Sequence, residues 1–496
     1  MTESPTVQRP LDHHGGPRLR GLGAPPEPRA DKGRFRWLID GLKPLELPDA
    51  TLTALAASMV DDSGGGGWSG QPTAADNPAL PAGYTYLAQF VDHDITFDPT
   101  SRLDRVDDAE AVRNFRTPRF DLDSIYGGGP KASPYLYNRN DEALLLVDGA
   151  PAGPRLSGLD LPRNSQERAL IGDPRNDVHV IISQLHLAFV AFHNAVVSHV
   201  RSNPALRWGD ESEFQTACRL VRWHYQWIVL HDLLPRIVGP ETVEAVLTRT
   251  GKRYKAGLKL YNLRFKDPYI PIEFSAAAYR FGHSLVRDSY VLNSSNPSPL
   301  PLFSADAGGA DLRGFRRLPE PLRVEWERFF PGLDGAPVPP GTPASGTLQP
   351  SMRLDGRLAP SLTHPPVDVD EQRRSIALLN LFRGQALGLP CGQDFADAVG
   401  RRIGESVHVL TSDELGQPGP VPLWFYLLRE AEVLGGGARL GPVGARVVAE
   451  VLIGLAMDDS SSLLQDDTGW TPVLPSATAG QFTIADLLRF AGAGPV

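Results

Sequence analysis

The chain has 496 residues, of which 49 are Lys or Arg and 58 are Asp or Glu, giving a formal net charge of −9 at pH 7. No run of basic residues could follow a phosphate backbone, so nucleic acid is not an expected partner. Two cysteines, Cys218 and Cys391, are too few for a disulfide framework. No apolar segment follows a basic one near the N-terminus, so we expect a cytoplasmic protein, with signal-independent export left open.

Helical periodicity dominates the chain, and strand-like alternation is scarce. Residues 1–35 are rich in Pro, Gly, Arg and His and are predicted to form an extended or disordered arm. Residues 36–496 are predicted to form one large domain. The predicted fold class is therefore mainly α with few short strands, and the predicted helices cover about 84–97, 178–200, 218–234, 271–288, 375–387, 423–434 and 444–457.

The segment 178–200 is the most apolar long stretch, yet its polar residues would be costly on a lipid-facing helix. A buried helix and no transmembrane segment are predicted. His179, His186 and His193 recur every seven residues on one face of this helix, about 10 Å apart at 1.5 Å per residue. That spacing is too long for one shared metal, so they are interpreted as core or interface histidines.

The stretch QFVDHDIT at 89–96 places an amide, two carboxylates and an imidazole in an apolar segment. On a helix, Gln89, Asp92 and His93 share one face, whereas Asp94 points about 100° further round. The residues are either a charged helix end that faces water or a preorganised site in which His93 performs acid–base work. In the second case Asp94 would supply an oxygen ligand behind the helix.

The segment TPRFDLDSIYG at 117–127 offers partners for Asp94. In an extended loop, the Thr117 hydroxyl, the Arg119 carbonyl and the carboxylates of Asp121 and Asp123 would converge on one side. Such a set of oxygens suits Ca²⁺. A polar turn ahead of Tyr126 and Gly127 would explain the same residues, and spacing alone does not separate the two hypotheses.

Three further motifs carry candidate residues. In GDPRND, Arg175 either snorkels at the start of the next helix or aims a permanent charge into a cavity. In AAAYRFGH, small residues surround His283, which is either a core histidine or lies against a flat, bulky group. In NLFRGQALGLP, Asn380 is a lone amide on an apolar helix and needs a buried partner, for which an imidazole N–H would serve.

Taken in this order, the motifs QFVDHD, TPRFDLDSIYG, GDPRND, YRFGH and NLFRGQALGLP resemble those of the animal-type haem peroxidases, the peroxidase–cyclooxygenase superfamily. The resemblance extends over about residues 80–460. It implies a single, mainly α domain with haem b in a central helical core and a bound Ca²⁺. It also implies a haem peroxidase that reduces H₂O₂ and oxidises small phenolic, aromatic or anionic donors through a ferryl intermediate.

The resemblance assigns a role to each candidate residue. His93 would be the distal base, Arg175 the distal cation and Gln89 the amide of the halide or water pocket. His283 would bind the haem iron, and Asn380 would accept a hydrogen bond from its other ring nitrogen. The remaining cofactor-binding residues would be Asp92, Arg280 and Arg383, and the calcium ligands would be Asp94, Thr117, Arg119, Asp121 and Asp123.

Two departures from the family limit what the resemblance implies. Val178 stands where mammalian members have a Glu that forms a second ester to haem, so at most a partial ester through Asp92 is expected. Arg280 stands where cyclooxygenases and fatty-acid dioxygenases have a radical Tyr, and Tyr279 is one residue away. Peroxidase chemistry is therefore favoured over a fatty-acid dioxygenase or hydroperoxide-processing enzyme. A non-catalytic haem- and calcium-binding protein is a further alternative.

Overall fold

The computed structural model describes residues 35–61, 68, 70–97, 116–149, 156, 158–263, 268–304, 310–363, 365 and 374–494. Residues 1–34 of the expected N-terminal arm lie outside this range. One hydrophobic cluster runs through the described part of the chain, from Phe35 near its start to Leu488 near its end. A much smaller cluster around Leu161 and Leu187 lies beside it.

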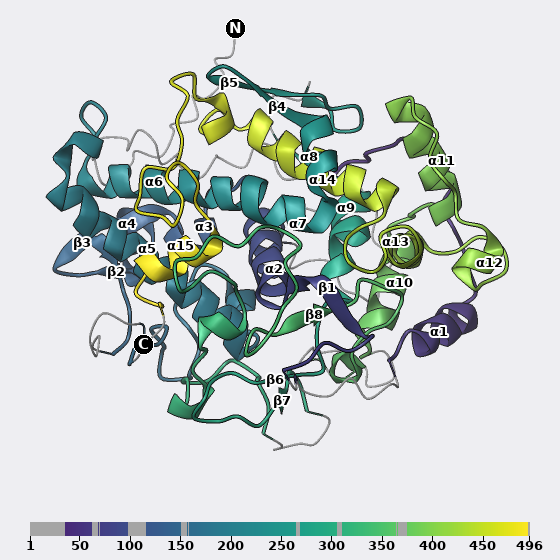
Figure 1. Cartoon of the computed structure of the whole chain (residues 1–496), viewed down its shortest axis with the longest axis horizontal. Coiled ribbons are helices and arrows are strands. Elements are labelled where there is room, and N and C mark those ends of the chain that lie inside the picture. The colour runs from purple at the N-terminus through teal and green to yellow at the C-terminus, as the bar shows by residue number, and fades with distance from the viewer. Residues whose placement is uncertain are drawn as a thin grey trace, which may run out of the picture.

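Helices make up most of the regular structure, as Figure 1 shows, and this confirms the predicted fold class. Eight short strands pair in twos and antiparallel, as β1–β8, β2–β3, β4–β5 and β6–β7. The helices are α1 (Asp49–Ser58), α2 (Gly83–Ile95), α3 (Asp123–Tyr126), α4 (Gly129–Ala132), α5 (Val180–Ser202), α6 (Glu213–Trp227), α7 (Leu234–Val238), α8 (Pro240–Val246), α9 (Ile272–Ala276), α10 (Ile376–Ala386), α11 (Gly392–Ile403), α12 (Ser412–Leu415), α13 (Leu423–Val433), α14 (Pro442–Asp458) and α15 (Ile484–Phe490). The strands are β1 (Asp76–Pro81), β2 (Tyr137–Asn138), β3 (Asp141–Leu145), β4 (Leu247–Thr250), β5 (Arg253–Ala256), β6 (Ser289–Tyr290), β7 (Leu300–Pro301) and β8 (Pro350–Met352).

Helix α2 lies near the centre of the molecule, against α5 (Figure 1). It begins at Gly83, where an added Cβ would come within 2.6 Å of the Phe329 carbonyl oxygen and of the Phe330 ring, so only glycine fits. Further along, the ring of Phe90 stacks on that of Phe189 with centroids 4.3 Å apart. These two contacts fix the position of the segment that carries Gln89 and His93.

Helix α5 is buried between α2 and α6, as predicted for the apolar segment. Within the described residues it is the one helix long and apolar enough to cross a membrane, and most of its apolar stretch is covered by the protein. Its histidines at 179, 186 and 193 are all buried, as expected for core positions. Two of them prove to have a further role at the candidate site.

The predicted helix over 271–288 is wrong in its second half. Helix α9 ends at Ala276, because the next residue, Ala277, leaves the helical region with a φ of −137° and a ψ of −70°. A tighter 3₁₀ helix, η6 (Ala278–His283), follows. Immediately after it, the Ser284 hydroxyl donates to the carbonyl oxygens of Arg353 and Asp355. These side-chain bonds to a distant segment replace the helix that the apolar spacing predicted.

Candidate active site

The imidazole of His93 is 7% exposed and is held by a residue from another segment. Its Nδ1 lies 2.7 Å from Oδ1 of Asn176, in the short 3₁₀ helix η2 (Pro174–Asp177). An amide oxygen only accepts, so the ring proton is on Nδ1 and Nε2 keeps its lone pair. Burial, with a smaller contribution from the Arg175 charge, lowers the pKa of His93 to about 4. The ring is therefore a neutral base at physiological pH.

Arg175 is anchored beside His93 by the backbone of α2. Its Nη2 donates to the carbonyl oxygens of His93, at 3.0 Å, and Thr96, and it pairs with Asp173 at 2.7 Å. Burial alone would raise the pKa of Asp173, but Arg175 holds it well below its usual range. For Nη1 no hydrogen bond is found within the described residues, and 29% of the Arg175 side chain is exposed. This nitrogen remains available to a ligand.

Gln89 and Asp92 both keep some exposure although α2 is a buried helix. Oε1 of Gln89 lies 3.0 Å from Nε2 of His179, and Asp92 accepts a hydrogen bond from the Thr96 hydroxyl. Burial lowers the pKa of His93, and the negative charge of Asp92 partly opposes this. Burial raises the pKa of Tyr279 in η6, and Asp92 raises it further. Asp92 is on α2, which contacts η6.

His283 ends η6, and its Nδ1 lies 2.8 Å from Nδ2 of Asn380 on α10. The Asn380 oxygen accepts from Nη1 of Arg280 at 2.8 Å. The residue pair was predicted, but the polarity of the bond differs, because the amide nitrogen donates to His283 instead of the oxygen accepting from it. The reason is Arg280, whose guanidinium can only donate and which donates its hydrogen bond to the Asn380 oxygen.

The segments that carry His93 and His283, α2 and η6, lie in contact. Burial, with a smaller contribution from the charge of Arg383, lowers the pKa of Arg280 to about 10. The charges of Asp92 and Arg175 also act on Arg280, so these four charged groups lie near one another. An added Cβ on Gly282 would meet no atom within 4 Å. His283, Gly282, Arg280 and Arg383 are all partly exposed despite their place in the interior. The open surroundings of Gly282, with His283 beside it and the cations Arg280 and Arg383 nearby, fit a flat, anionic group such as haem.

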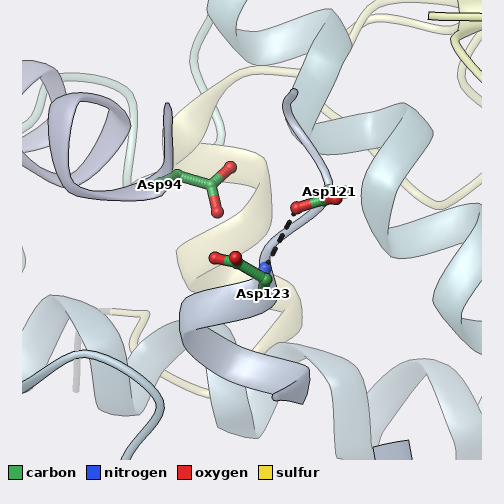
Figure 2. Close-up of side chains that lie close together, drawn as sticks. All are labelled: Asp94, Asp121 and Asp123. Carbon is green, nitrogen blue, oxygen red and sulfur yellow. Dashed lines mark hydrogen bonds between the residues drawn. The ribbon is translucent and has the colours of Figure 1, made fainter. Parts of the chain in front are cut away.

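A cluster of three carboxylates lies behind α2, as Figure 2 shows. Asp94, Asp121 and Asp123 each place an oxygen within 4.8 Å of the others. Asp94 is fully buried, and within the described part of the chain its Oδ1 has no hydrogen-bond partner. Burial raises the pKa of Asp94 far above its usual value, and the charges of Asp121 and Asp123 raise it further. An orphaned oxygen among three crowded carboxylates fits a hard cation such as Ca²⁺.

The other two predicted calcium ligands lie beside this cluster. The Thr117 hydroxyl donates to Oδ2 of Asp121 at 2.6 Å. The side chain of Arg119 points instead toward Asp459, with Nε 3.8 Å from Oδ1. Burial raises the pKa of Asp123 to about 7, against the lowering effect of its partner Arg116. Oxygen donors therefore gather as predicted, and the Arg119 carbonyl stays a prediction.

Three residues that hold the site were not assigned to it from the sequence: Asn176, His179 and His186. Asn176 is fully buried and joins two histidines. Its Nδ2 lies 3.1 Å from Nδ1 of His186, and its oxygen accepts a hydrogen bond from Nδ1 of His93. Asn176 follows Arg175 directly in GDPRND, so that motif could have pointed to it. No local signal distinguished the site histidines on α5 from His193, which contacts Tyr126.

The animal haem peroxidase family profile matches residues 98–304 of this chain. Peroxidasin of Drosophila melanogaster is 24% identical over 383 residues, which are 69% of this chain and 22% of that protein. A chorion peroxidase of the same organism is 31% identical over 299 residues, 56% of this chain and 32% of the relative. The chain thus spans a minor part of the length of the curated relatives it matches.

Solved structures share the fold over nearly the whole chain. Peroxidase A from Dictyostelium discoideum superposes with a TM-score of 0.59 at 15% identity, covering 93% of this chain and 94% of the other. A fatty acid alpha-dioxygenase from Arabidopsis thaliana gives a TM-score of 0.55 at 14% identity, covering 92% of this chain and 76% of the other. The shared fold agrees with the animal haem peroxidase profile match over residues 98–304 of this chain.

Proposed function

We propose that this protein is a haem peroxidase that reduces H₂O₂ and oxidises small phenolic, aromatic or anionic donors. The observation that carries the proposal is a pair of histidines on two contacting segments, α2 and η6, each bonded to an asparagine. His93 is fixed as a neutral base by Asn176, and His283 is held by Asn380. A satisfied core histidine would need neither the nearby cations nor the open surroundings of Gly282.

His283 would hold the haem iron through Nε2, with Arg280 and Arg383 supplying positive charge for the propionates. When bound, the haem supplies the redox-active iron at which the peroxide O–O bond breaks. An iron at Nε2 leaves the ring proton on Nδ1, so the Asn380 amide must turn its oxygen toward His283. Arg280 must then release that oxygen, which frees its guanidinium for an anionic group.

His93 and Arg175 are proposed to carry out the proton transfer and the charge stabilisation. In this proposal Nε2 of His93 would take a proton from the peroxide and return it to the leaving oxygen. Nη1 of Arg175 would stabilise the negative charge that develops as the bond breaks. Because Arg175 is fastened to the carbonyl of His93, the base and the cation move as one unit.

Calcium forms the second part of the proposal. Asp94 directly follows His93 on α2 and turns to the opposite side, toward Asp121 and Asp123. An ion held by these carboxylates would neutralise their repulsion and fasten the end of α2 to the 117–123 segment. Calcium would thereby help to fix the position of His93.

A fatty-acid dioxygenase is the main alternative, and its fold is shared. Tyr279 is buried with an unpartnered hydroxyl, and its ring stacks on Phe274 at 4.7 Å. The position that carries the radical tyrosine in such enzymes holds Arg280, which bonds to Asn380. Oxygen uptake with an unsaturated fatty acid would favour this alternative, and its absence would favour the peroxidase.

Optical titration of the haem-loaded protein with H₂O₂ tests the function. We expect His93→Ala to keep its haem but to react with H₂O₂ at least about 100-fold more slowly, the lower end for loss of a general base. His283→Ala should lose or misligate the haem. The exposed His408 serves as a matched control, and His408→Ala should behave as wild type. Wild-type kinetics in His93→Ala, or an unchanged ferric spectrum in His283→Ala, would contradict the proposal.

A further inference from the structure

His179 stands at the start of α5, where it caps the helix through its ring. Its Nδ1 accepts the backbone N–H of Ile182 at 3.2 Å. The residue is 2% exposed, and its ring contacts those of Tyr86, at 5.0 Å, and Phe303, at 6.4 Å. Both the capping bond and the packing prevent the ring from turning.

The capping bond settles which nitrogen of His179 carries the proton. A backbone amide can only donate, so Nδ1 is unprotonated and the neutral ring carries its hydrogen on Nε2. Burial lowers the pKa of His179 to about 3, with a smaller lowering effect from His93. The ring thus stays neutral, with Nε2–H as its single donor.

That donor faces Gln89. Nε2 of His179 lies 3.0 Å from Oε1 of Gln89, which is one helical turn before His93 on α2. The Gln89 amide oxygen therefore accepts the hydrogen bond from His179, and the Gln89 NH₂ group remains as a donor. No hydrogen bond to Nε2 of Gln89 is found among the described residues, although Gln89 keeps partial exposure in the interior.

We propose that His179 is a positioning residue that locks Gln89 as a hydrogen-bond donor beside His93, and thereby selects small anions and lone-pair oxygens at this site. The proposal rests on the peroxidase function above and names a determinant of what binds there. If the Gln89 amide rotated by 180°, its NH₂ group would face the Nε2–H of His179, and two hydrogen-bond donors would lie opposite each other. It would also present a carbonyl oxygen to the ligand, which repels anions.

Two substitutions separate this role from helix capping. His179→Asn keeps a side-chain oxygen that can accept the Ile182 N–H, since Asn is among the best capping residues, but it is too short to reach Gln89. Gln89→Leu removes the amide itself. The probe is fluoride, a small anion that binds ferric haem and accepts hydrogen bonds from neighbouring donors. Its affinity is read from the absorption spectrum at fixed pH.

We expect His179→Asn to weaken fluoride binding about tenfold or more, as for the loss of one hydrogen bond to a charged acceptor. Gln89→Leu should weaken it by at least as much, and the double variant should be no weaker than Gln89→Leu alone. Unchanged fluoride affinity in His179→Asn, or additive losses in the double variant, would overturn the proposal.

The same two variants are compared in the haem-free protein by urea unfolding. A non-additive loss of stability there shows that the His179–Gln89 bond forms in the protein without haem. Additive losses would contradict the bond on which the proposal depends. Failure of the wild-type protein to bind haem would contradict both the peroxidase function and the anion selectivity. Unchanged fluoride affinity in a haem-loaded variant would contradict the anion selectivity alone.

Discussion

Nδ1 of His93 lies 2.7 Å from Oδ1 of Asn176, and the Asn176 amide reaches on to His186. The chain of three side chains joins α2, η2 and α5, three segments that meet only in the folded protein. It fixes the proton of His93 on Nδ1. The opposite nitrogen is thereby kept as a base.

Asn176→Leu should therefore impair His93 without touching the haem. We expect the reaction with H₂O₂ to slow about 10- to 100-fold, the usual cost of losing the partner that orients a functional histidine. Haem content should stay at the wild-type level. Asn176→Asp retains an acceptor for Nδ1 and should react faster than Asn176→Leu, as measured by stopped-flow absorption. Equal rates in both variants and wild type would show that His93 needs no orienting partner.

The carboxylate cluster should bind one Ca²⁺ per chain, measured by elemental analysis of the purified protein. We expect Asp121→Asn to lose calcium and to lower both the melting temperature and the peroxidase activity, because α2 is then less firmly held. Asp467→Asn, which changes an exposed acid, is the control. A wild-type protein without calcium, together with native activity and stability in Asp121→Asn, would show that the 117–123 segment is only a polar turn.

Asp92 should form a partial ester to haem. It is partly exposed on α2, which contacts η6, and Val178 cannot supply the second ester found in mammalian relatives. We expect acid–acetone extraction after H₂O₂ treatment to leave part of the haem on a peptide that contains Asp92. Asp92→Ala should release all of it. Fully extractable haem from peroxide-treated wild type would refute the linkage and leave the peroxidase function standing.

His224 predicts how stability depends on pH. Its Nδ1–H donates to the Leu220 carbonyl, and its Nε2 accepts from the backbone of Val473 and Leu474. Burial lowers the pKa of His224 to about 3. Below the ordinary pKa near 6.5 the unfolded chain binds a proton that the native protein does not. The free energy of unfolding should therefore decrease as pH falls from 6.5, by about 1.4 kcal/mol per pH unit for this group.

Urea unfolding between pH 4.5 and 7 measures this slope. We expect a shallower slope in His224→Gln, with the remainder coming from other buried histidines such as His186 and His193, whose pKa values burial also lowers. The exposed His408 provides the control, and His408→Gln should leave the slope unchanged. A slope in His224→Gln as steep as in wild type would contradict the prediction.

Local geometry made much of the site predictable. The spacing of Gln89, Asp92, His93 and Asp94 follows from one α-helix, and the helix is found where the apolar period places it. The acids at 121 and 123 reach Asp94 as the alternating loop predicted. The face that the α2 residues share and the side on which the two loop acids lie each need only the conformation of one short segment, whereas the meeting of Asp94 with that loop joins two segments.

The sequence by itself determined the mainly α fold and the side chains available to the site, because helical periods and residue types are local properties. Only the tertiary structure decided that Asn176 meets His93, that His179 meets Gln89 and that Arg280 takes the oxygen of Asn380. Each of these bonds joins residues more than 80 positions apart. Which buried donor meets which acceptor depends on how the helices pack, and short-range spacing carries no record of that packing.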